Sequence, residues 1–113
     1  MIIKSRRLTK LFSWVIDVAA ITIYPFIIVH PAYADDPVLI NHEKIHLEQQ
    51  KETLLIGFYI LYLLEFIYLR LFKIKDNFRA YKAISFEREA YAYELDSNYI
   101  KTRKRFAWIN DYI

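Results

Sequence analysis

The chain has 113 residues, which is enough for one domain with a modest core and too few for two. Hydrophobic residues make up 56% of it, including ten Tyr and eight Phe, and this capacity to bury surface excludes a disordered chain. The formal net charge of +3 is small and dispersed, so charge predicts no nucleic-acid partner. The absence of cysteine excludes a disulfide framework and every zinc site that needs a thiolate.

The N-terminal part has a basic start, an apolar run over residues 11–29 and an Ala-x-Ala triplet at 32–34. These are the parts of a secretory signal peptide, but the run is long and is interrupted by Asp17 and Pro25, so we expect no cleavage. β-branched and aromatic residues crowd the same run. We therefore predict two short antiparallel strands within 11–29. The second is predicted to be an edge strand, because a proline inside a strand pattern is typical of a sheet edge.

A helix start follows at Asp36-Pro37, where the aspartate can cap the helix and the proline fits its first position. This start predicts a helix over residues 37–51. Within that helix, residues 42–46 read His-Glu-Lys-Ile-His, which is an H-E-x-x-H motif.

The spacing of the motif predicts a metal site. Residues i and i+4 share a helix face, so His42 and His46 can present imidazole nitrogens to one zinc ion. Glu43 can reach a water molecule bound to that ion and is the predicted general base. Gln49 lies on the same face and is a candidate to support the histidines.

A catalytic zinc site needs a third protein ligand and an open position for water. A metzincin would have Gly at 49 and His at 52, where this chain has Gln49 and Glu52, so that class is excluded. Deformylase-like sites use a cysteine ligand, which the chain lacks. The remaining histidine, His30, stands beside Pro31 and is predicted to lie in a turn. The third ligand is therefore expected to be a downstream carboxylate.

Three glutamates compete for this role. Glu87 and Glu89 each stand three residues before an alanine, and a small residue there lets their helix approach the motif helix closely. Glu65 lies in an otherwise apolar helix, where a metal, Arg70 or a buried hydrogen bond would each offset the cost of its burial. Glu87 is favoured, and Glu65 and Glu89 stay open as alternatives.

Residues 54–72 are nearly all apolar and predict one long helix. Their number approaches the roughly 20 residues that span a bilayer, although a buried core helix has a similar composition. A further helix is predicted over 85–98, with Ser85 as its cap. We expect residues 1–113 to form a single domain with a mostly helical α+β fold, in which a short antiparallel β element precedes the helices.

The segments HEKIHLEQQ and FEREAY, separated by the apolar helix, resemble the small gluzincin-type zinc metallopeptidases. In that family the two histidines of H-E-x-x-H and a glutamate on a later helix hold zinc. The resemblance covers the order of elements over residues 20–98, and this order is also similar to that of peptidases embedded at membranes. It departs at Tyr91, since many gluzincins have Asp four residues after the ligand glutamate.

The resemblance implies the roles of the site residues. His42, His46 and Glu87 would be the zinc ligands, and Glu43 would be the general base. The strand around residues 21–29 would be the edge along which an extended peptide or protein substrate lies.

The predicted function is zinc-dependent peptide hydrolysis, in which Glu43 takes a proton from water and returns it to the leaving amine. The sequence does not choose an oxyanion donor, for which the candidates are Tyr81, Arg79, Tyr91 and Arg88. One alternative is a catalytically silent interaction or membrane-associated protein with a coincidental or inherited motif, in which residues 54–72 dock to lipid or to a partner. Another is a zinc hydrolase that acts on a non-peptide bond. The expected localisation is membrane-associated or cytoplasmic. So small a chain has few other elements to cover an apolar helix, and this slightly favours the membrane.

Overall fold

A computed structural model describes residues 2–7 and 20–112 of the chain. One small sheet contains β1 (Ile2–Lys4), β2 (Ala20–Ile23) and β3 (Phe26–Val29), in the order β1-β3-β2. β2 and β3 are antiparallel, with Ile21 opposite Ile28, whereas β1 runs parallel to β3. Residues 11–19 of the predicted β element lie outside the described part.

The predicted antiparallel pair forms, but the prediction that its second strand is an edge was wrong. β3 is the central strand, because β1 pairs with its other side and makes the sheet mixed. Pro25 lies in the turn between β2 and β3, not inside a strand, and so carries no information about an edge. Within the described sheet, β2 is the edge strand next to the motif helix.

Helices make up most of the rest, and the structure confirms a mostly helical α+β fold. After the short 3-10 helix η1 (Pro31–Tyr33), the chain forms α2 (Pro37–Glu52), α3 (Ile56–Phe72), α4 (Asn77–Ala83), α5 (Ser85–Tyr93), α6 (Tyr99–Thr102) and α7 (Ala107–Tyr112). His30 lies in the predicted turn, where its Nδ1 accepts a hydrogen bond from the Ala32 amide at 3.1 Å.

Helix α2 starts as predicted. The Asp36 carboxylate accepts from the amides of Val38 and Leu39 at 3.0 and 3.2 Å, and Pro37 occupies the first turn. Helix α3 starts two residues later than predicted, because Leu54 and Leu55 adopt positive φ angles in a turn. The two helix axes are bent by 108° at this break.

The prediction that Ser85 caps α5 was wrong. Ile84 is the N-cap, and Ser85 is the first helical residue. Glu65 of α3 takes the role of a cap from outside, because its carboxylate accepts from the Ser85 amide at 2.9 Å and from the Ser85 hydroxyl at 2.7 Å.

Helix α5 also ends earlier than the predicted residue 98. The Asn41 side-chain amide donates to the carbonyls of Tyr93, Glu94 and Asp96 at 2.9–3.2 Å, which satisfies carbonyls at the helix end. Because the next helical bonds are replaced by these contacts, the chain turns and continues as α6.

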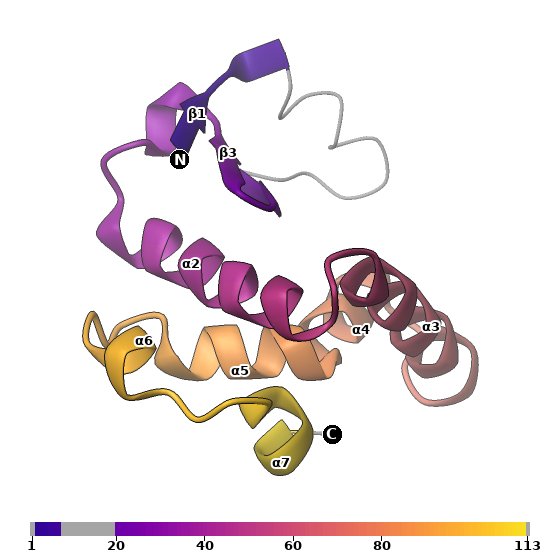
Figure 1. The fold of residues 1–113 in the computed structure, drawn as a ribbon. Coiled ribbons are helices and arrows are strands. Elements are labelled where there is room, and N and C mark those ends of the chain that lie inside the picture. Colours follow the sequence, from indigo (N-terminus) through magenta and orange to yellow (C-terminus); the bar gives the residue numbers. More distant parts are fainter. Residues whose placement is uncertain (1, 8–19, 113) are drawn as a thin grey trace.

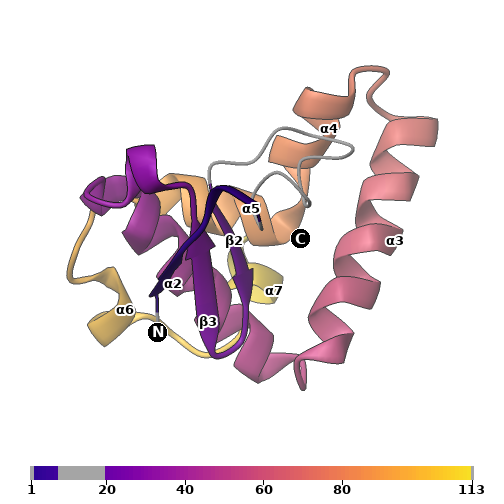
Figure 2. The same ribbon diagram turned by 90° about the horizontal axis from the view of Figure 1, so that it is seen from above.

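The elements stack in layers, with the sheet over one side of α2, α5 against its other side, and α7 beyond α5 (Figure 1). Helices α3 and α4 stand at the side of this stack (Figure 2). One apolar cluster joins Phe58, Ile84, Phe86 and Trp108, and a second joins Ile45, Ala90 and Tyr99. This stacking buries the H-E-x-x-H face of α2 between β2 and α5. Within residues 2–7 and 20–112, no single helix is long and apolar enough to cross a membrane, although α2 and α3 together pass that test as a bent pair.

Candidate metal centre

Two helices bring three ligand-type side chains together. His42 and His46 lie one turn apart on α2, and Glu87 lies in the first turn of α5. The Glu87 Oε1 atom is 2.9 Å from Nε2 of His42 and 3.0 Å from Nε2 of His46, and the two Nε2 atoms are 3.2 Å apart. All three residues are buried. This group could hold a metal ion.

The spacing suits a tetrahedral ion. Zinc binds imidazole nitrogen and carboxylate oxygen at about 2.0–2.1 Å, so two ligands on one tetrahedron lie about 3.3 Å apart. The separations of 2.9–3.2 Å are a few tenths of an ångström below this value. A small outward movement of the three side chains would therefore admit the ion.

Gln49 determines which nitrogen of His46 faces the centre. Its Nε2 donates to the Phe86 carbonyl at 3.0 Å and to Glu89 at 2.9 Å, so its Oε1 must face His46, whose Nδ1 lies 2.7 Å away. An amide oxygen can only accept, and His46 therefore carries its proton on Nδ1. Its Nε2 is therefore the nitrogen that faces the centre and can bind a metal. In known metal sites, a hydrogen bond from the other ring nitrogen fixes the tautomer of the ligand histidine in the same way. The structure thus supports the predicted role of Gln49.

Glu89 lies outside the centre and supports it indirectly. It is fully buried and accepts from Gln49, from the Tyr99 hydroxyl at 2.7 Å and from Arg103. Arg103 also contacts both carboxylate oxygens of Glu52, at 2.7 and 3.0 Å. The Glu65 carboxylate accepts hydrogen bonds from Ser85. Neither Glu65 nor Glu89, the two alternative ligands, therefore lies with the histidines.

The other oxygen of Glu87 is held by a tyrosine that the sequence analysis did not identify. The Tyr62 hydroxyl of α3 donates to Oε2 at 2.6 Å, which turns Oε1 toward the histidines. Burial raises the pKa of Glu87, but the charges and hydrogen bonds of His46 and His42 outweigh burial and hold it below its ordinary value. Burial lowers the pKa of His46, and here Glu87 dominates and raises it to about 9. Both shifts favour the charged forms of His46 and Glu87, whose Nε2 and Oε1 atoms are 3.0 Å apart.

His42 has a different environment. Its ring packs edge-to-face on Tyr91, with centroids 4.5 Å apart, at the position where many gluzincins have Asp. The Glu94 carboxylate lies 3.9 Å from Nδ1 of His42, beyond hydrogen-bond distance. Glu94 is the C-cap of α5 and stands seven residues after Glu87, and this two-turn spacing is the sequence signal that both lie on one side of the helix.

The predicted base is oriented by the sheet. The Thr22 hydroxyl of β2 is 2.5 Å from Oε2 of Glu43 and 3.2 Å from the Glu43 carbonyl. Both residues are buried. Nothing in the local sequence links residues 22 and 43, because the contact depends on how the sheet lies across α2.

A cleft of about 170 Å³ opens at the centre. Glu43, His46 and Glu87 line it, together with three tyrosines, Tyr59, Tyr62 and Tyr81. Of the predicted oxyanion candidates, Tyr81 is the one among the lining residues, whereas Arg79 and Arg88 are exposed.

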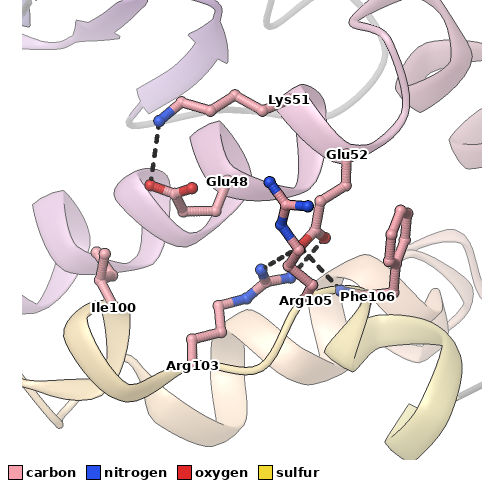
Figure 3. A pocket seen from close by; sticks show the side chains of 7 residues that line it. All are labelled: Glu48, Lys51, Glu52, Ile100, Arg103, Arg105 and Phe106. Atoms are coloured by element: carbon pink, nitrogen blue, oxygen red, sulfur yellow. Dashed lines mark hydrogen bonds and ion pairs between the residues drawn. The ribbon is translucent and has the colours of Figure 1, made fainter.

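A larger pocket, of about 310 Å³, lies on another part of the surface (Figure 3). Four of its five charged lining residues are paired with one another, Lys51 with Glu48 at 3.3 Å and Arg103 with Glu52. It contains neither motif histidine, so it is not the candidate centre.

Comparisons of this chain with protein-family models, with curated protein sequences and with solved structures found no match. The likeness to gluzincins therefore rests on the motif, the later glutamate and the order of the helices. What the structure adds is the buried group of His42, His46 and Glu87, which could bind a metal ion.

Proposed function

We propose that this chain is a zinc-dependent metallopeptidase. The observation that carries the proposal is the convergence of His42, His46 and Glu87 beside Glu43, which matches the three ligands and the adjacent base of a catalytic zinc site. When bound, zinc would supply an activated water and polarise the scissile carbonyl. Imidazole and carboxylate donors, with no thiolate in the chain, suit that ion.

Glu43 is the proton carrier in this proposal. It takes a proton from the attacking water and returns it to the leaving amine, which requires that its carboxylate reach both groups from the cleft. The Thr22 hydroxyl binds Oε2 of Glu43 and so orients the other oxygen. Thr22 acts through Glu43 and is a positioning residue.

Tyr81 is the proposed oxyanion donor. Burial, followed by the charge of Glu87, raises the pKa of Tyr81 and of Tyr62 above the ordinary value, so both hydroxyls keep their protons at neutral pH. Tyr62 already donates to Glu87. Tyr81, whose hydroxyl lies 3.4 Å from that of Tyr91, is left as the tyrosine that can turn toward a substrate oxygen.

An extended peptide would lie along β2, the edge strand that lines the cleft. Part of this edge is already occupied, because the Thr22 carbonyl accepts from Gln50 at 2.8 Å and from the Tyr59 hydroxyl at 3.0 Å. The backbone N–H and C=O groups of every second residue point to the same edge of a strand, so those of Ala20 lie on the same edge as those of Thr22. Pairing with a substrate is therefore expected at Ala20.

The test combines metal content with hydrolysis of a fluorogenic peptide mixture. Wild type should bind one zinc per chain, and His46→Ala should lose it. Glu43→Gln should keep zinc and lose hydrolysis, whereas Glu48→Gln, the same change at a partly exposed site of α2, should keep both. A wild type that takes up no zinc after supplementation, or zinc-loaded wild type no more active than Glu43→Gln, would refute the proposal.

A further inference from the structure

The side of α3 that faces away from the stack is mostly apolar. We call it the outer face; it comprises Ile60, Leu63, Leu64, Ile67, Leu71 and Phe72, which are 42–74% exposed. Their spacing of three and four residues places them on one stripe of the helix. Helix α3 lies at the side of the molecule in Figure 2, and these exposed fractions show that little among the described residues covers the stripe. A contiguous apolar surface of this kind marks an interaction site.

The charges of α3 are turned away from the outer face. Glu65 is partly buried and accepts both bonds from Ser85. Arg70 donates to the Asn77 side chain at 2.7 Å, at the start of α4. The helix therefore keeps its two charged groups on the protein side and presents only carbon and tyrosine hydroxyls outward.

This chemistry suits lipid better than protein. A protein–protein interface carries about one hydrogen bond per 100–200 Å² and a polar rim. The six residues of the outer face offer no hydrogen-bonding group, and Tyr68 beside them, which is 49% exposed, adds a hydroxyl. At the C-terminal end of α3, three exposed cations follow, Lys73, Lys75 and Arg79. Cations beside an apolar helix face are the complement of anionic headgroups above acyl chains.

We propose that α3 docks flat on an anionic phospholipid bilayer, with the outer face among the acyl chains and Lys73, Lys75 and Arg79 at the phosphates. In-plane docking agrees with the length of the helix, because 17 residues extend about 25 Å. Tyr59 is exposed on α3 and also lines the cleft, so docking places the rim of the cleft beside the bilayer. The docking does not depend on peptidase activity.

The test is flotation of the full chain with phosphatidylcholine vesicles, with and without phosphatidylserine. Wild type should float with the vesicles that contain phosphatidylserine. Leu64→Glu combined with Leu71→Glu should weaken partitioning by about tenfold or more, since both carboxylates would enter the acyl layer. These side chains are 58% and 68% exposed, so the fold should persist, as circular dichroism would verify. Leu95→Glu, at an 83% exposed leucine outside α3, is the matched control and should float like wild type.

A second variant separates the contribution of charge. Lys73→Glu combined with Lys75→Glu should remove the preference for phosphatidylserine. The docking is refuted if wild type floats with neither vesicle, or if the double leucine variant floats as well as wild type. A wild-type dimer that the leucine changes dissociate, without vesicle binding, would instead identify a second copy as the occupant and also refute the proposal. Glu43→Gln should float normally, so failure of the peptidase proposal is distinguishable from failure of the docking.

Discussion

Replacing Gln49 with leucine tests whether this side chain orients His46, the proposed metal ligand. The substitution removes the acceptor for Nδ1 of His46 and the donors to Phe86 and Glu89, at 2.7–3.0 Å. Without the acceptor, the imidazole is no longer held in the tautomer whose Nε2 faces the centre. Leucine is of similar size, so the change acts mainly on hydrogen bonds.

Two magnitudes follow from these contacts. Loss of a hydrogen bond behind a metal-bound histidine weakens metal affinity about 10–100-fold, which is about 1.4–2.7 kcal/mol of binding free energy. The His46 N–H is left unsatisfied and buried, which costs about 1–3 kcal/mol of folding free energy. The Phe86 carbonyl loses its bond from Gln49 but lies in the first turn of α5, where the helix still supplies a donor. Glu89 keeps its bonds from Tyr99 and Arg103 and adds little to that cost.

The assay is zinc affinity by competition with a chelator, together with urea unfolding of the metal-free protein. Gln50→Leu is the matched control, because Gln50 is the next residue, is equally buried, and binds Thr22 and Tyr24 but not His46. Both variants should be destabilised, and only Gln49→Leu should bind zinc more weakly. Equal zinc affinity in the two variants would refute the orienting role of Gln49.

Four further outcomes are expected. Tyr62→Phe removes the donor to the ligand carboxylate and should weaken zinc binding about tenfold by calorimetry; unchanged affinity would contradict this role. Because the adjacent carboxylate raises the pKa of His46 to about 9, zinc must displace a proton at neutral pH, so affinity should rise with pH up to about 9. Calorimetry in buffers of different protonation enthalpy measures the released proton, and its absence would contradict the ion pair. The same raised pKa stabilises the metal-free fold fully below pH 6.5, and this contribution is lost as pH rises through 9. Arg103→Ala leaves the buried carboxylate of Glu89 without its cation and should lower the free energy of unfolding in urea by about 3–5 kcal/mol. Arg105→Ala, at an exposed arginine, should lower it little.

Local signals predicted the helices better than the sheet. Asp36 and Pro37 start α2 as expected, because capping acts within one turn of the chain. Pro25 misled the assignment of the edge strand, because it lies in the local turn between β2 and β3. The pairing that makes β3 central joins residues far apart in sequence, such as Ile2 and Ile27. Ser85 was misread as a cap for a related reason, since the acceptor of its amide is Glu65 from another helix.

By itself, the sequence determined the helix over the motif and the sharing of one face by His42 and His46, because capping and i,i+4 spacing are set by the chain's own local geometry. Only the tertiary structure decided which glutamate meets them. Glu87 and Glu89 differ by two residues and so face about 200° apart on α5, and the packing of α5 on α2 turns the first to the histidines and the second to Arg103. Thr22 and Tyr62 receive their roles in the same way, from contacts between elements that no local pattern encodes. Gln49 differs, because its i,i+3 spacing from His46 on α2 already indicated its role.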